Sequence, residues 1–181
     1  KIFAETKLML TNKIKLNTKK LESLKNAISK ELETLTKAIY HEAGGTFNIN
    51  SPKQIASVLF ERLKLQSIKK KKTSGGQRKT DRDVLEGLQN AHPIIPHILS
   101  YRESFKILSS FVNPLLELTD SKGRLHTTFL QTGTATGRLA SANPNLQNVP
   151  QESKWASSLR ETFEPEKGWS FVSFDYSQLE L

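Results

Sequence analysis

A stripe of apolar side chains between Leu21 and Ile39, spaced three and four residues apart, is the feature that most constrains the fold. Because an α-helix has 3.6 residues per turn, this spacing places the stripe on one helix face. Asn17 or Thr18 can cap the start of the helix, and the pair Gly44–Gly45 can take the left-handed conformation that ends it. This glycine stop favours a long helix packed inside its own domain over a coiled coil with a separate partner.

Three further helices are expected before residue 118. The run Asn50–Pro52 offers a capping residue followed by proline in the first turn, where no amide hydrogen is needed. Thr80 is expected to cap a short helix, and Pro93 and Pro96 to begin a longer one with near-heptad apolar spacing. The part of the chain before residue 118 is therefore predicted to be helical.

The pattern changes near residue 119, where we expect a boundary. Residues 124–130 alternate as a strand does, and residues 131–153 are too long and polar for a simple connection. A short helix is expected within residues 155–163, and a closing strand follows Gly168. This second part therefore reads as α+β.

Composition excludes several classes of protein. Hydrophobic residues make up 36% and charged residues 25% of the chain, which excludes wholesale disorder and collagen-like architectures. With no long apolar run, no cysteine and four scattered histidines, neither a membrane span, a disulfide framework nor a zinc site is expected. We expect a soluble protein from a reducing compartment. Because the chain starts with Lys1 and stops within a strand pattern, we expect it to be a piece of a longer protein.

The positive charge is concentrated in one stretch. The formal net charge of +9 divides into +4 for residues 1–50, +8 for residues 51–82 and −3 for residues 83–181. The middle stretch contains a run without apolar residues and with two adjacent glycines, which predicts an exposed loop. Its cations would neutralise phosphates in a salt-dependent, sequence-independent way, or would form only a solvated loop. They are Lys69, Lys70, Lys71, Lys72, Arg78, Lys79 and Arg82.

Polar groups after residue 131 are candidates for ligand binding. The run Gly133–Arg138 lacks the ending of a phosphate-binding loop and is not expected to be one. Arg138 and the amides that follow it can donate to bases or phosphates, although each alone is more often a turn residue. Asp175 stands where an apolar strand is expected to end, a position that suits either a metal ligand or a strand-terminating turn.

Three segments make the chain resemble the family A DNA polymerases, the bacterial DNA polymerase I group. They are residues 43–54 (AGGTFNINSPKQ), residues 134–139 (TATGRL) running into residues 144–150 (PNLQNVP), and residues 175–181 (DYSQLEL). The last segment matches the family's motif A. The segments follow the family's order and span nearly the whole chain.

The resemblance implies a fold class that is mainly α, a helical thumb, followed by the beginning of an α+β palm, as in a truncated fragment of a right-hand polymerase. Residues 1–118 would form the basic, duplex-binding thumb, and residues 119–181 the part of the palm that ends in motif A. The basic loop would then contact the DNA backbone, which agrees with the distribution of charge.

For the palm, the resemblance implies a role for each matching residue. Asp175 and Glu180 are the candidate catalytic residues, since Asp175 resembles the aspartate that binds two Mg²⁺ ions and Glu180 resembles the steric gate against a ribose 2′-hydroxyl. Tyr176 would offer its backbone carbonyl to one Mg²⁺ ion. Gln178, together with Glu180, would bind the incoming nucleotide.

The second segment is implied to hold the primer end. Arg138 matches the arginine that contacts the minor-groove acceptor at the primer terminus, a contact that checks geometry because every correct pair presents such an acceptor. Gln147 and Asn148 would support the same duplex end. Arg160 is a less specific match.

The implied function is template-directed addition of deoxynucleotides to a primer 3′-hydroxyl with two Mg²⁺ ions, in replication or repair. The expected partners are primer-template DNA and deoxynucleoside triphosphates, and no association with a membrane is expected. The protein is expected to be a monomer in the cytoplasm, of bacterial or phage-like origin. An organellar origin is left open. Because the family's fingers helix and second catalytic aspartate lie downstream of motif A, we expect these 181 residues alone to be inactive. The alternative is a catalytically inactive fragment or paralogue that only binds duplex DNA.

Overall fold

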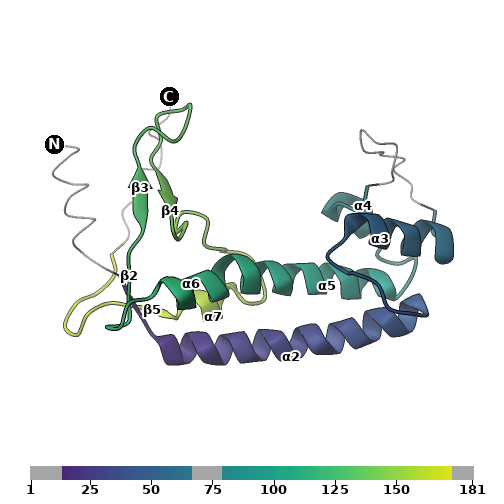
Figure 1. The fold of residues 1–181 in the computed structure, drawn as a ribbon, viewed down its shortest axis with the longest axis horizontal. Coiled ribbons are helices and arrows are strands. Elements are labelled where there is room, and N and C mark those ends of the chain that lie inside the picture. The colour runs from purple at the N-terminus through teal and green to yellow at the C-terminus, as the bar shows by residue number, and fades with distance from the viewer. Residues whose placement is uncertain (1–13, 67–78, 173–181) are drawn as a thin grey trace. The chain divides into compact units, whose positions relative to one another are not determined.

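The structure is a computed structural model, and it describes residues 14–66 and 79–172 (Figure 1). Two compact units are formed by these residues. The described residues up to Leu24, together with those from Phe111 onward, make one unit, and those between Lys25 and Ser110 make the other. The boundaries of these two units differ from the expected boundary between thumb and palm near residue 119. The division into thumb and palm stays a prediction.

The long helix expected from the apolar stripe is α2, Thr18–Ala43. Asn17 caps it, because its Oδ1 accepts a hydrogen bond of 3.0 Å from the backbone N–H of Lys20. Gly44 follows with a φ of +66°, the left-handed conformation that was expected at this end. Arg62 donates a hydrogen bond of 3.1 Å to the carbonyl of Ala43, which satisfies one of the free carbonyl groups at the helix end.

The second helix is also confirmed, and it continues beyond its first turns. Ser51 caps α3, Pro52–Ser57, and proline occupies the first turn. A π-helical turn, η1 (Val58–Arg62), extends the helix. Sequence reasoning found the start of this helix because caps are local, but it did not find the change of helix type.

The third helix, α4 (Arg82–Glu86), corrects one expectation. Its cap is Asp81, whose carboxylate accepts a hydrogen bond of 3.1 Å from the N–H of Val84, and not Thr80. Thr80 is buried and accepts hydrogen bonds from the guanidinium of Arg102 at both its carbonyl and its hydroxyl. Thr80 therefore anchors the segment before the helix instead of starting it.

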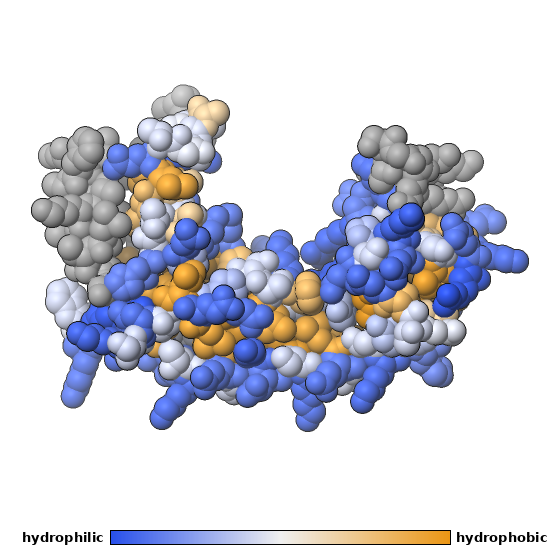
Figure 2. Space-filling model, viewed as in Figure 1, coloured by the Kyte–Doolittle hydropathy of each residue, from blue (hydrophilic) through white to orange (hydrophobic). Residues whose placement is uncertain are grey.

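The fourth helical run consists of three pieces, α5 (Ile94–Ile107), the π-helical turn η2 (Leu108–Val112) and α6 (Asn113–Leu118). In the unit between Lys25 and Ser110, α5 packs beside α2, α3 and α4 around a shared core (Figure 1). Its fully buried side chains are Ile39, Ile55, Leu59, Leu85, Ile94, Ile95 and Ile98. Hydrophilic side chains cover the opposite face of α2 (Figure 2).

The other unit contains two small antiparallel sheets. In the first, β1 (Ile14–Leu16) lies between β2 (Arg124–Leu125) and β5 (Phe163–Glu164). In the second, β3 (Thr128–Leu130) pairs with β4 (Ala140–Ala142). The short helix α7 (Ala156–Arg160) lies within the range expected for it.

Two strand expectations are corrected. The strand expected over residues 124–130 is split into β2 and β3, which pair with different partners, so the chain changes sheet at His126 and Thr127. The strand expected after Gly168 is not formed over its described residues 169–172, because no described strand pairs with them. Residues 173–175 lie outside the described part of the chain.

The fold class expected from the sequence is confirmed in outline. Helices dominate, and the strands form small antiparallel sheets. Among the described residues, no helix has the length and apolar character needed to cross a membrane.

The N-terminus of α2 gives the first testable prediction. Asn17 caps the helix and also donates a hydrogen bond of 2.9 Å to Glu164, so Asn17→Ala should lower the free energy of unfolding by about 1 kcal/mol in urea denaturation. Thr18→Ala is the matched control, because Asn17 and not Thr18 occupies the cap position. Equal stability of Asn17→Ala and wild type would contradict the assignment.

The same contact predicts a pH dependence. Hydrogen bonds from Asn17 and Lys20 hold the pKa of the Glu164 carboxyl below its usual value. The ionised Glu164 carboxyl therefore contributes its full stability above the pKa that it has in the unfolded chain. This stability is lost as the pH falls through the lower pKa that Glu164 has in the folded protein. In an NMR titration, the Glu164 pKa of Asn17→Ala should move back toward the usual value.

Candidate nucleic-acid interface

The hairpin of β3 and β4 carries the first of the polar segments. Residues 131–139 connect the two strands, whose register pairs Thr128 with Ala142 and Leu130 with Ala140. Gly133, in this loop, packs close to Leu130 at the end of β3. A Cβ added at Gly133 would lie 3.2 Å from Cβ of Leu130. Because an antiparallel strand and not a helix follows, the loop lacks the helix N-terminus of a phosphate-binding loop.

Two side chains fix the backbone around Arg138. The Thr134 hydroxyl donates a hydrogen bond of 2.6 Å to the carbonyl of Arg138. The Gln147 side-chain amide donates one of 2.8 Å to the carbonyl of Leu139, the next residue. Arg138 itself is exposed. The backbone that presents its guanidinium is thus held from both sides of the motif.

The turn after β4 carries Gln147 and Asn148, both exposed. It begins at Asn143, which has a φ of +52°, and contains the cis peptide Asn143–Pro144. The hydroxyl of Ser141, in the middle of β4, accepts from the backbone N–H of Leu146 at 3.1 Å and of Gln147 at 3.3 Å. The turn is therefore folded back onto the strand by a side chain of that strand.

The 2.8 Å contact places the Gln147 side chain beside Leu139, the residue after Arg138, and Asn148 follows Gln147 in the chain. The guanidinium and the two amides belong to exposed residues and can donate hydrogen bonds to carbonyl, phosphate or base acceptors. The sequence analysis named these residues but did not find Ser141 or Thr134 as their supports. Thr134 opens the first matching segment and Ser141 stands between the two, but hydroxyl residues are common in any turn and gave no specific signal.

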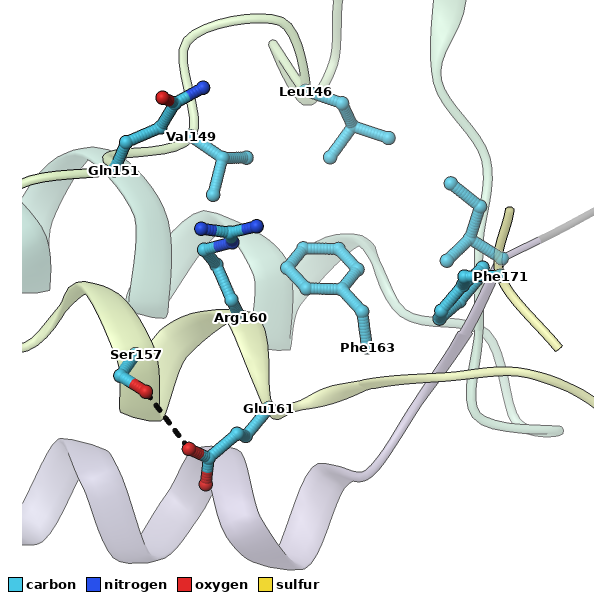
Figure 3. Close-up of a pocket in the computed structure, with 9 residues that line it drawn as sticks. Leu146, Val149, Gln151, Ser157, Arg160, Glu161, Phe163 and Phe171 are labelled. Carbon is cyan, nitrogen blue, oxygen red and sulfur yellow. Dashed lines mark hydrogen bonds between the residues drawn. The ribbon is translucent and has the colours of Figure 1, made fainter. Parts of the chain in front are cut away.

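A pocket of about 630 Å³ lies next to α7 (Figure 3). Its walls are mainly apolar, and Arg160 at the end of α7 points into it beside Val149 and Phe163. At its rim, the Ser157 hydroxyl donates a hydrogen bond of 3.0 Å to Glu161. The lining residues are Ile14, Leu146, Val149, Gln151, Ser157, Arg160, Glu161, Phe163 and Phe171. The pocket joins residues far apart in the chain, so sequence spacing gave no signal for it.

Of the predicted basic loop, the structure describes the end that enters α4. Lys79 is exposed there, directly before the buried Thr80. Arg102 binds Thr80 from α5, and burial lowers the pKa of this guanidinium, although it stays charged at neutral pH. Lys69, Lys70, Lys71, Lys72 and Arg78 lie outside the described residues.

The motif A residues also lie outside the described part of the chain: Asp175, Tyr176, Gln178 and Glu180. Within residues 14–66 and 79–172, no three histidine or acidic side chains are grouped so as to hold a metal ion. The roles expected for these residues stay predictions.

A comparison with protein families decides where the chain belongs. The model of "DNA polymerase family A" matches residues 18–181. The chain belongs to DNA polymerase family A. The matched range takes in all three segments on which the resemblance was based, from the end of α2 to motif A.

Individual relatives agree with this family. The chain is 51% identical to a DNA polymerase I from Caldicellulosiruptor bescii over 84% of its own length and 18% of that protein. It is 43% identical to the thermostable DNA polymerase I of Thermus aquaticus, over 93% of the chain and 20% of that protein. The chain therefore spans about a fifth of the length of these family A relatives.

A solved family A structure has the same fold. The POL domain of Pol1 from M. smegmatis, in complex with a DNA primer-template and dNTP, superposes with a TM-score of 0.81 at 35% sequence identity. The match covers 90% of this chain and 28% of the other. The two units described above therefore correspond to part of a family A polymerase domain.

Proposed function

We propose that this chain is part of a template-directed DNA polymerase that adds deoxynucleotides to the 3′-hydroxyl of a primer, in replication or repair. The observation that carries the proposal is the family A match from Thr18 through motif A, in which the carboxylates of Asp175 and Glu180 are intact. Since the chain spans about a fifth of its relatives, the activity belongs to the complete protein.

The hairpin and its turn are proposed to bind the primer end. Arg138, Gln147 and Asn148 are exposed. Hydrogen bonds from Thr134 and Gln147 hold the backbone carbonyls of Arg138 and Leu139. Minor-groove acceptors occur on every correct base pair, so donors that contact them test pair geometry without reading sequence. The complex of the related POL domain with primer-template and dNTP supports DNA and nucleotide as the partners.

Motif A is proposed to supply the chemistry. The carboxylate of Asp175 and the backbone carbonyl of Tyr176 are hard oxygen donors, the kind that Mg²⁺ takes in proteins. Held by these oxygens, Mg²⁺ would lower the pKa of the attacking hydroxyl and would neutralise charge that develops on the phosphate. Glu180 is proposed to exclude a 2′-hydroxyl from the space beside the sugar, and Gln178 to assist in binding the nucleotide.

We further propose that the 181 residues alone do not incorporate nucleotides, because they hold one of the two catalytic aspartates that the resemblance implies. Primer extension by the complete polymerase tests the function, and the separate chain can be assayed beside it. We expect the complete polymerase to extend the primer and the separate 181 residues not to extend it.

The basic loop gives a prediction for DNA binding. Each lysine that neutralises a phosphate contributes about 0.9 to the slope of log affinity against log salt. Replacing Lys69, Lys70, Lys71 and Lys72 by alanine in the complete polymerase should make this slope shallower by about 3.6. Fluorescence anisotropy with duplex DNA at several salt concentrations measures the slope.

A control with the same change of charge separates local binding from net charge. Lys19, Lys25, Lys30 and Lys37 are exposed on α2, and their replacement by alanine removes the same four charges. The slope of this control should stay close to that of the wild type. If both variants lower the slope equally, the basic loop has no special role in binding the DNA backbone.

A further inference from the structure

We propose that Ser141 is a positioning residue for the primer end, because its hydroxyl fixes the turn that carries Gln147, and Gln147 in turn fixes the backbone that presents Arg138. This inference rests on the proposed function of the hairpin. It adds a residue to which neither the sequence resemblance nor the pattern of charge assigned a role.

The hydroxyl of Ser141 is buried and fully used. The residue is 4% exposed, and its Oγ accepts from the N–H groups of Leu146 and Gln147 while donating to Oδ1 of Asn145 at 3.2 Å. A serine hydroxyl has one hydrogen to donate and two lone pairs to accept with, so all its capacity is satisfied. A methyl group at this place could replace none of these bonds.

The bonds of Ser141 act on the turn and not on the hairpin. Ser141 pairs through its backbone with Phe129 in the β3–β4 ladder, and this pairing does not involve the hydroxyl. Loss of the hydroxyl therefore leaves the ladder in place. The N–H of Leu146 loses its hydrogen bond to Ser141. The N–H of Gln147 keeps its 3.1 Å hydrogen bond to Oδ1 of Asn145.

The effect reaches Arg138 through one further contact. Gln147 uses its side-chain amide to bind the carbonyl of Leu139, next to Arg138, at 2.8 Å. Thr134 binds the carbonyl of Arg138 from the other side. A turn that is no longer fixed by Ser141 would weaken the first contact and with it the support of the backbone next to Arg138. Such a displacement matters where donors must meet acceptors on a base pair.

The test is a double-mutant cycle in the complete polymerase. Single-turnover incorporation is measured for Ser141→Ala, Gln147→Ala and the double variant, on matched and on mismatched primer ends. Ser141→Ala should lower kcat/KM on a matched end about tenfold and should reduce the preference for matched over mismatched ends. The double variant should be no more than about twofold worse than Gln147→Ala, because both substitutions break the same chain of contacts.

Matched variants separate positioning from folding. Ser109→Ala makes the same change at an exposed hydroxyl of η2, which donates a hydrogen bond to the carbonyl of Phe105, and should keep wild-type activity. Ser141→Thr, which keeps the hydroxyl, should recover the preference for matched ends. If Ser141→Ala does not fold, Asn145→Ala carries the same cycle with Gln147→Ala, since Asn145 is exposed and accepts from both Ser141 and Gln147.

The outcomes are distinct. Non-additive losses together with a reduced preference for matched ends support the inference. Multiplicative losses, an equal loss on both primer ends, or wild-type activity of folded Ser141→Ala would overturn it. An inactive wild-type polymerase would instead contradict the proposed function, so the two failures can be told apart.

Discussion

Replacing Asp175 with alanine in the complete polymerase will abolish nucleotide incorporation and leave primer-template binding nearly unchanged. The carboxylate is proposed to hold Mg²⁺ at the reacting atoms, whereas the hairpin donors and the basic loop are proposed to hold the DNA. We expect the single-turnover rate to fall by more than about 1000-fold, which is about 4 kcal/mol in the activation barrier. Rapid-quench incorporation measures the rate, and anisotropy measures DNA affinity.

Glu152→Ala is a control for the loss of one negative charge. This exposed carboxylate lies in the segment before α7, and its removal should leave both the rate and the affinity close to wild type. An Asp175→Ala polymerase that incorporates nucleotides at a near-normal rate would refute the assignment of the metal ligand. A parallel loss of DNA binding would also contradict it, since the carboxylate would then act in binding or folding.

Glu180→Ala should let the polymerase accept ribonucleotides. An apolar pocket alone discriminates weakly against an added hydroxyl, so selection requires a group that occupies the space of the 2′-hydroxyl. Removing this side chain should lower the ratio of kcat/KM for deoxynucleotides over ribonucleotides by about 100-fold or more, mainly through faster use of ribonucleotides. Steady-state or single-turnover extension with each nucleotide set measures the ratio.

The variant Glu180→Gln tests the physical basis of this selection. Glutamine keeps the size of the side chain and removes its charge, so exclusion by bulk predicts that Glu180→Gln retains most of the discrimination. Unchanged discrimination in Glu180→Ala would show that another residue selects the sugar. A large loss in both variants would mean that the charge, and not the bulk, excludes the hydroxyl.

The helical half of the fold could be predicted because its determinants are local. The stripe from Leu21 to Ile39 repeats with the helical period, and Asn17, Ser51 and Gly44 lie at helix ends where capping requires such residues. Thr80 shows the limit of this reasoning. Thr80 and Asp81 are adjacent and both residue types can cap a helix, but Asp81 caps α4 and the Thr80 hydroxyl accepts from Arg102.

The strands were harder to predict because their pairing is not local. Leu16 in β1 pairs with Phe163 in β5, and Ile14 pairs with Leu125 in β2, across more than a hundred residues in each case. Segments of two or three residues carry too little alternation to be recognised before their partners are known. For the same reason the alternating segment 124–130 could not show that it divides between two sheets.

The residues of the candidate interface could be predicted from the sequence, but the hydrogen bonds that hold them in place could not. Arg138, Gln147 and Asn148 lie in segments with a recognisable sequence, and in the fold Gln147 binds the carbonyl of Leu139, next to Arg138. The side chains that hold them there, Ser141 and Thr134, are ordinary turn residues whose role appears only in their hydrogen bonds. The pocket beside Arg160 likewise depends on tertiary packing.

The central claim is tested most directly by primer extension with the complete polymerase that contains this chain, in the presence of Mg²⁺ and deoxynucleotides on a defined primer-template. We predict template-directed extension by the complete protein and none by the 181 residues assayed in parallel. A complete protein that does not extend primers, yet binds primed duplex in a salt-dependent way, would contradict the account and leave duplex-DNA binding as the function of this chain.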